Sequence, residues 1–239
     1  MNDFLTVTTF LWHDDARVRS YKFDPSHVVV LRNMVKRHLS IDHEFVCVTD
    51  RPFKEDGIRC APLDMSKHVP GTCFVRLMLR HPRIGSLLGR RILNLDLDCV
   101  VVDSLNQIVD RREPSVFWRN PNWPAPGRAF YQTSIQLLDA GSHSELWTDF
   151  DPKVTPSWVN RRYGGREQAW ASERLSHDLP HWTDADGIYG AGRLFNGSPD
   201  NGVQTELPKN ARIVFFPGNR EPSQLEVQQM HPWIGAHYK

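Results

Sequence analysis

Residues 91–103 read RILNLDLDCVVVD, a run of aliphatic and β-branched residues in which the polar side chains alternate. Both properties are typical of a β-strand. Because successive side chains of a strand point to opposite faces, we expect Asn94, Asp96 and Asp98 on one face and the alternating leucines on the other. The two aspartates then lie about 6.6 Å apart along the strand.

The three valines that follow indicate that this strand is buried. Two ionised carboxylates in a buried strand lose hydration and repel each other, unless one of them is protonated. A divalent cation such as Mn²⁺ or Mg²⁺ removes this conflict and keeps coordination positions open for phosphate. The alternative is that Asp96 and Asp98 are solvated at the end of the strand and pair with Arg90 or Arg91.

The composition excludes several classes of protein. The chain has 239 residues, with 29 basic and 28 acidic side chains and a net charge of +1. This balance gives no sign of a nucleic-acid partner or an anionic membrane surface. The four cysteines include no Cys-x-x-Cys pair, which argues against a zinc site and suits a cytoplasmic protein with reduced thiols. We expect no signal peptide, because the first residues lack a basic n-region and a cleavage site, and no membrane span, because no apolar run is long enough.

Predicted strands and helices alternate along the first half of the chain. Leu5–Trp12 and Glu44–Thr49 have the composition of strands, and Asp24-Pro25 is a typical helix start. A second helix is expected to be capped by Thr72 and to reach Arg80. This alternation predicts a mostly parallel α/β sheet.

Polar side chains mark the ends of three predicted strands. Thr8 and Thr9 come late in the first strand, Asp50 follows the second, and Asp96 and Asp98 lie in the central one. Ligands of such sheets bind beyond the carboxyl ends of the strands. We therefore expect these side chains to converge on one crevice.

Six segments carry a further signal by their order along the chain: Val48–Asp50, Arg76, Gly89–Asp98, Tyr131–Gly141, Glu167–Trp170 and Phe215–Pro222. This order resembles the GT-A glycosyltransferases, and most closely the family 8-like branch with glycogenin and the bacterial lipopolysaccharide galactosyltransferases. The resemblance spans most of the chain. It implies a Rossmann-type, mostly parallel sheet flanked by helices, with an irregular C-terminal cap. It also implies a single domain over residues 1–239, with a nucleotide-binding half at 1–115 and an acceptor and catalytic half at 116–239.

The resemblance implies a metal-dependent, hexosyltransferase-like enzyme that transfers a sugar from a nucleotide-sugar donor, most often UDP-linked. The acceptor would be a hydroxyl of a glycan, lipid, protein or other compound. Asp96 and Asp98 would bind Mn²⁺ or Mg²⁺, and Glu167 and Gln168 would lie at the reaction centre. The predicted donor-binding residues, from the strand ends and the resemblance together, are Thr8, Thr9, Asp50, Arg76, Asn94, Asp96, Gln132, Thr133, Ser134, Gly218 and Arg220.

Two of these roles have structural alternatives. Glu167 would stabilise an oxocarbenium-like centre in a retaining enzyme, or act as general base in an inverting one. As an alternative, it is a first-turn helix glutamate that is stabilised by the helix dipole. Arg76 would clamp phosphate or sugar, or else it is a surface arginine on an amphipathic helix.

The sequence departs from the family pattern at the third metal ligand. The family places a histidine just before the glycine of its C-terminal motif, but residues 215–222 read FFPGNREP and contain none. The metal would then have fewer protein ligands, or His231 or His237 would substitute. A weakened or absent metal site is the remaining alternative.

Two other functions are compatible with the sheet. A sugar-nucleotide nucleotidyltransferase needs a glycine-rich loop after the first strand, and residues 12–16 contain no glycine. A nucleotide-sugar-binding protein without transferase activity is favoured by the missing histidine and disfavoured by the Asp-x-Asp pair. A nucleic-acid-modifying transferase has no basic-groove signal to support it.

Overall fold

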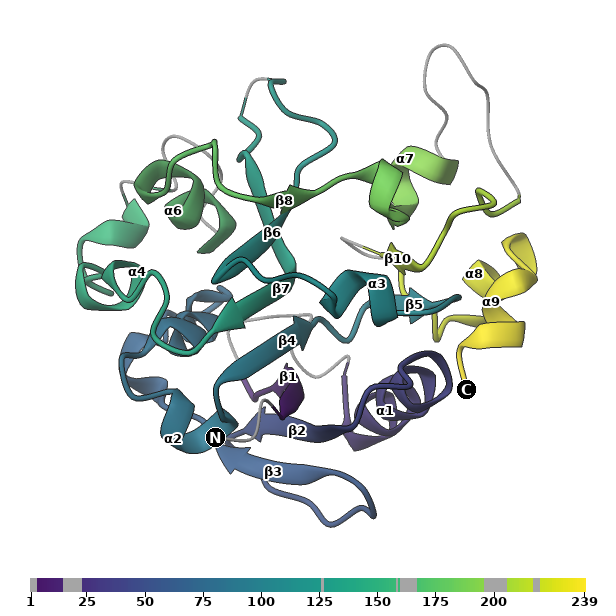
Figure 1. The fold of residues 1–239 in the computed structure, drawn as a ribbon, viewed down its shortest axis with the longest axis horizontal. Helices are drawn as coiled ribbons and strands as arrows, with labels where there is room; N and C mark the ends of the chain where they lie inside the picture. The colour runs from purple at the N-terminus through teal and green to yellow at the C-terminus, as the bar shows by residue number, and fades with distance from the viewer. Residues whose placement is uncertain are drawn as a thin grey trace.

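The computed structural model of the chain describes residues 4–14, 23–125, 127–157, 159, 167–195, 206–216 and 220–239. Its centre is a seven-stranded sheet with the order β3-β2-β1-β4-β7-β6-β8 (Figure 1). The strands are β1 Leu5–Leu11, β2 His43–Thr49, β3 Arg59–Pro62, β4 Arg91–Leu95, β6 Ser115–Arg119, β7 Tyr131–Asp139 and β8 His181–Trp182. Only β7 is antiparallel to its neighbours, so the predicted mostly parallel α/β sheet is confirmed.

A second, three-stranded sheet has the order β5-β10-β9. Its strands are β5 Cys99–Val101, β9 Ile188–Gly190 and β10 Ile213–Phe215. The predicted continuous strand over residues 91–103 is therefore wrong, because the chain leaves the large sheet after Leu95 and joins the small one at Cys99. Apolar residues lie on both sides of the break, so the sequence pattern does not reveal where the neighbouring strand changes. Asp96 and Asp98 lie in the turn between the two sheets, not on one strand face.

Most helices are short. They are α1 Pro25–His38, α2 Gly85–Leu88, α3 Asn106–Val109, α4 Glu145–Thr148, α6 Glu167–Arg174, α7 Ala191–Phe195, α8 Leu225–Met230 and α9 Trp233–His237. The 3₁₀ helices are η2 Met65–Lys67, η3 Phe74–Arg80 and η4 Asp184–Asp186. The predicted start of α1 is confirmed, because the Asp24 side chain accepts a hydrogen bond from Ser26 N and Pro25 is the first helical residue. The helix expected to end at Arg80 is a 3₁₀ helix that begins at Phe74.

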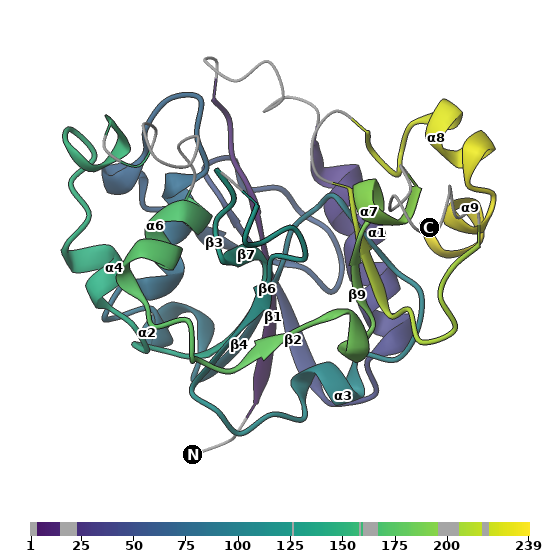
Figure 2. The same ribbon diagram turned by 90° about the horizontal axis from the view of Figure 1, so that it is seen from above.

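Helices cover both faces of the large sheet. Val7 and Leu93 face the core that also contains residues of α1 and of the small sheet. Phe10 and Ile92 face the opposite core, which is shared with η3, α4 and α6. Figure 2 shows α2, α4 and α6 on one side of the sheet and α1, α8 and α9 on the other.

The C-terminal end of the chain lies against α1. The guanidinium of Arg37 donates to the carbonyl oxygens of His237 and Lys239, at 2.5 and 2.6 Å. None of the helices in the described parts of the chain has the length and apolar character that crossing a membrane would require.

Candidate functional site

A buried group of charged side chains lies at the carboxyl end of β4. Arg76 of η3 donates through Nη1 to Asp96 Oδ1 and through Nη2 to Glu167 Oε1. Thr133 of β7 donates through Oγ1 to the same Glu167 oxygen at 2.9 Å. The Arg76 and Glu167 side chains are only 9% and 3% exposed, whereas Asp96 is 18% exposed and reaches solvent. Four segments that are distant in sequence therefore meet at one position.

The electrostatic balance of the group keeps Arg76 charged. Burial acts to lower the pKa of its guanidinium, but the nearby charge of Asp96 acts in the opposite direction, and the net pKa is raised. The alternative that Arg76 is a surface arginine is wrong, because its side chain is buried between two carboxylates.

The turn that carries Asp96 and Asp98 is held from both sheets. Asp96 N donates to the carbonyl oxygen of Ser134 in β7 at 2.9 Å, and Asp98 O accepts from Phe216 N, just after β10, at 2.7 Å. These bonds fix the backbone of both aspartates. The carboxylate of Asp96 then contacts Arg76 of η3, and the same guanidinium contacts Glu167 of α6.

Asp96 and Asp98 offer the donor set of a hard divalent cation. Two carboxylates that are completed by substrate phosphates and water form a common type of Mg²⁺ site. In the described ranges, no three His, Cys, Asp or Glu side chains are grouped so that they could hold a metal ion. Neither His231 nor His237 therefore supplies the third ligand among these residues. His237 instead lies near His38 at the end of α1, with the ring centroids 6.2 Å apart.

Three predicted donor-binding residues lie inside the sheet. Thr8 and Thr9 were expected at the end of the first strand, but β1 pairs with β2 as far as Leu11, and both residues are fully buried. Thr8 Oγ1 donates to Val46 O at 3.0 Å, a contact between the two strands. Asn94 is also fully buried, between Thr8 and Gln136 on the neighbouring strands. The crevice predicted at the strand ends therefore does not include the Thr8 and Thr9 side chains.

Other predicted residues lie nearer the surface. Asp50 is exposed at the end of β2, where its carboxylate oxygens accept from His13 N at 3.2 and 3.3 Å. Gln132 and Ser134 are half-buried on β7, and Gln168 is half-buried on α6 next to Glu167. These positions agree with a site at the carboxyl edge of the sheet.

The C-terminal motif is only partly described. Gly218 lies outside the described residues. Arg220 is exposed, and it lies close enough to His231 that its charge, after the effect of burial, helps to lower the pKa of that imidazole.

Sequence reasoning missed Asp14, which follows β1. Its side chain is 2% exposed; it accepts from Gly71 N at 2.8 Å and lies 3.9 Å from His68 Nε2. It thereby connects the loop after β1 with the segment that precedes η3. Its place directly after a predicted strand was a usable signal, because ligand loops of α/β sheets begin there.

Comparison with known proteins identifies the fold. No protein-family model matches the chain, and no curated protein matches its sequence. Among solved structures, it is similar to the galactosyltransferase LgtC in complex with donor and acceptor sugar analogs, with a TM-score of 0.60 at 12% identity. The match covers 98% of this chain and 96% of that one. The chain has the GT-A glycosyltransferase fold.

Two more structures share this GT-A fold. An active-site mutant of LgtC has a TM-score of 0.59 at 11% identity, over 98% of this chain and 96% of that one. The bifunctional glycosyltransferase WbbM, in its apo form, has a TM-score of 0.58 at 10% identity. That match covers 95% of this chain but 48% of the WbbM chain. The resemblance inferred from the six sequence segments is thus confirmed at the level of the fold.

Proposed function

We propose that this protein is a glycosyltransferase that moves a sugar from a nucleotide-sugar donor, most simply a UDP-sugar, to an acceptor hydroxyl. The observation that carries the proposal is the contact of Arg76 with both Asp96 and Glu167 at the carboxyl end of β4. In an α/β sheet, ligands bind at this edge.

The site offers buried atoms for sugar hydroxyls. Glu167 Oε2 and Arg76 Nε are inaccessible to solvent, and neither has a hydrogen-bond partner among the described residues. Buried polar atoms without partners are costly, so a side-chain shift that opened them to a sugar hydroxyl would be favoured. Such a hydroxyl supplies both a donor for the carboxylate and an acceptor for the guanidinium N–H.

In the reaction, the bond from the anomeric carbon to the diphosphate breaks, and a bond to the acceptor oxygen forms as that oxygen loses its proton. Glu167 either stabilises the positive charge at the anomeric carbon or takes the acceptor proton, according to the stereochemical outcome. The half-buried Gln168 beside it would orient the sugar or the acceptor.

Asp96 and Asp98 would hold a divalent cation, which when bound supplies Lewis-acid stabilisation to the leaving diphosphate. A unit positive charge about 4 Å from the developing negative charge contributes about 4 kcal/mol at an effective dielectric constant near 20. Arg76 acts on the carboxylate of Asp96 itself, because its hydrogen bond to Oδ1 fixes the orientation of that carboxylate.

The test is a calorimetric titration of UDP, with and without Mn²⁺ and with GDP as control, on the wild type and on Asp96→Ala. The matched control is Asp103→Asn, an exposed aspartate beyond β5 in the same stretch. We expect metal-dependent UDP binding in the wild type and the control and its loss in Asp96→Ala. No nucleotide binding by the wild type, or equal binding by all three proteins, would refute the proposal. Binding without turnover over a broad acceptor set would identify a nucleotide-sugar-binding protein instead.

A further inference from the structure

The strand β7 contains a bulge next to the candidate site. Phe117 of β6 pairs with Gln136, but the next residue, Trp118, pairs with Gln132. Residues 133–135 are therefore extra on the β7 side. A bulge bends its strand and redirects side chains, and bulges are common beside active sites. Two of these extra residues contact the candidate site: the Thr133 hydroxyl donates to Glu167, and the Ser134 carbonyl oxygen accepts from Asp96 N.

Gln136 fills the bulge with its side chain. Its Nε2 donates to the carbonyl oxygen of Thr133 at 3.2 Å, which replaces a bond that the interrupted pairing cannot make. Its Oε1 accepts from Arg80 Nη2 at 2.5 Å. Because an arginine only donates, this contact fixes which end of the amide faces Thr133. Both Gln136 and Arg80 are buried, with exposures of 4% and 2%.

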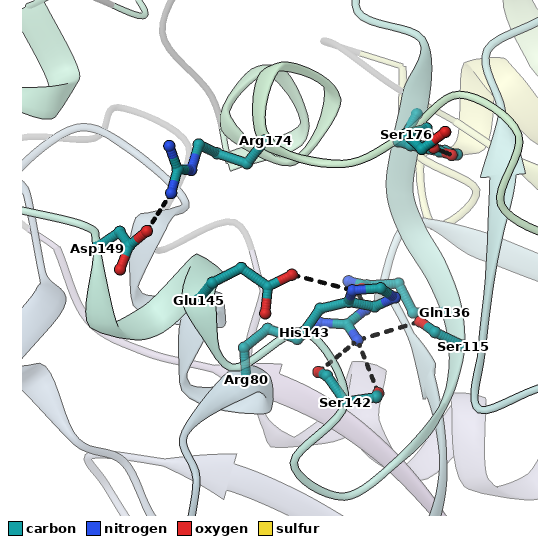
Figure 3. Close-up of polar contacts among 10 residues, drawn as sticks. Arg80, Ser115, Gln136, Ser142, His143, Glu145, Asp149, Arg174 and Ser176 are labelled. Carbon is teal, nitrogen blue, oxygen red and sulfur yellow. Dashed lines mark hydrogen bonds and ion pairs between the residues drawn. The ribbon is translucent and has the colours of Figure 1, made fainter.

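Arg80 is itself held by uncharged acceptors. Nη1 lies 3.2 Å from Ser115 Oγ and 3.4 Å from both the carbonyl oxygen and Oγ of Ser142 (Figure 3). The guanidinium also lies 4.8 Å from the centre of the Phe117 ring. Burial lowers the pKa of Arg80 to about 9, although the charge of Glu145 acts in the opposite direction. A cation buried without a hydrogen-bonded carboxylate is costly, which indicates that its position serves a purpose beyond stability.

We infer that Arg80 and Gln136 are a positioning pair that fixes the β7 bulge and thereby places Thr133 against Glu167. The inference rests on the proposed function for its consequence in catalysis. The chain of contacts runs from Arg80 to the Gln136 amide, to the Thr133 carbonyl, and from the Thr133 hydroxyl to Glu167 Oε1. Neither member of the pair belongs to the group formed by Arg76, Asp96 and Glu167.

The variant Gln136→Glu tests the pair. A carboxylate keeps an acceptor for Arg80, so the fold is retained, but it has no N–H to donate to Thr133 O and repels that carbonyl. We expect kcat to fall about 100-fold, because a displacement of about 1 Å at the site has effects of this size. The dissociation constant for UDP should stay within about threefold of the wild type. Arg80→Lys keeps the positive charge but loses the planar guanidinium, and it should lower kcat less than Gln136→Glu does.

A second readout does not depend on activity. Asp96 N donates to Ser134 O inside the bulge, so hydrogen exchange at the Asp96 amide reports whether the bulge is ordered. We expect faster exchange there in both variants. The matched control is Asp149→Asn, which removes an exposed ion pair with Arg174 that is also drawn in Figure 3 and should change neither readout.

Each outcome decides the inference. Faster exchange together with lower kcat supports it. Unchanged exchange at Asp96 overturns it, and so does faster exchange with unchanged kcat. If the wild type binds no nucleotide, the proposed function fails separately, and the exchange measurement alone decides whether the pair holds the bulge.

Discussion

Replacing Arg76 by methionine removes the only cation that contacts both Asp96 and Glu167 among the described residues. Methionine keeps an unbranched apolar stem and has no charge, so the change removes both ion pairs while it retains part of the packing. Glu167, with a side-chain exposure of 3%, would be left buried without a counter-charge. Removing one partner of a buried ion pair typically costs about 3–5 kcal/mol.

For Arg76→Met we expect a cost at the lower end of this range. The Asp96 side chain is 18% exposed, so solvent compensates part of its charge, and Glu167 still accepts from Thr133. We therefore expect a loss of about 3 kcal/mol in the free energy of unfolding. For a chain of this size, about 2–4 °C of melting temperature correspond to each kcal/mol, which gives a decrease of about 6–12 °C.

The assay is thermal unfolding followed by circular dichroism. Arg59→Met is the control, because Arg59 pairs with Glu44 at the surface, where the two side chains are 40% and 36% exposed and the loss should stay below about 1 kcal/mol. The double variant Arg76→Met with Glu167→Gln should be more stable than Arg76→Met alone, since no buried charge remains uncompensated. The reasoning is refuted if Arg76→Met unfolds no earlier than Arg59→Met, or if Glu167→Gln lowers the stability of the Arg76→Met variant further.

Three further predictions concern stability. The hydrogen bond from Arg111 lowers the pKa of Glu113 to about 2, so its stabilising effect is present above the ordinary value of 4.5 and is lost as the pH falls toward about 2. As the pH falls from 4.5 to about 2, the melting temperature of Glu113→Gln should therefore decrease less than that of the wild type. Gly187 has φ 83°, and a Cβ there would lie 2.2 Å from Asn210 O, so Gly187→Ala should cost more than about 1 kcal/mol in denaturant unfolding. Gly235 lies in the α9 helix with open space around it, so Gly235→Ala should stabilise the protein by about 0.5–1 kcal/mol. Equal effects of Gly187→Ala and Gly235→Ala on the free energy of unfolding would contradict both expectations.

The fold was predictable where local sequence preferences and tertiary structure agree. The Asp24-Pro25 start of α1 depends on a side-chain cap and a proline ring, both of which act over a few residues. The change of sheet after Leu95 depends instead on which strand supplies the backbone partners. Those partners are Ser134 and Phe216, which lie far along the chain, and no local pattern encodes them.

The candidate site was predictable to a similar degree. Asp96 was predicted because charged residues beside an apolar run indicate a ligand edge, whereas Glu167 was predicted only through the family resemblance; in the structure Arg76 contacts both. The prediction that the Thr8 and Thr9 side chains face a crevice at a strand end was wrong, because threonine fits inside a buried strand as well as at its end. Arg80 was not identified as a site residue, because its partners are neutral groups on other elements and only the folded chain brings them together.

The turn at Asp96–Asp98 has a consequence for synthesis of the protein. Its second backbone anchor is Phe216 N, so the anchor is made more than one hundred residues after the aspartates. A nascent chain can form β1, β2 and β4 while β10 is still inside the ribosome, but Asp98 then has no strand to hold it. The candidate site is therefore completed late, and a chain that is interrupted before residue 216 would carry both aspartates without the backbone bond that holds Asp98.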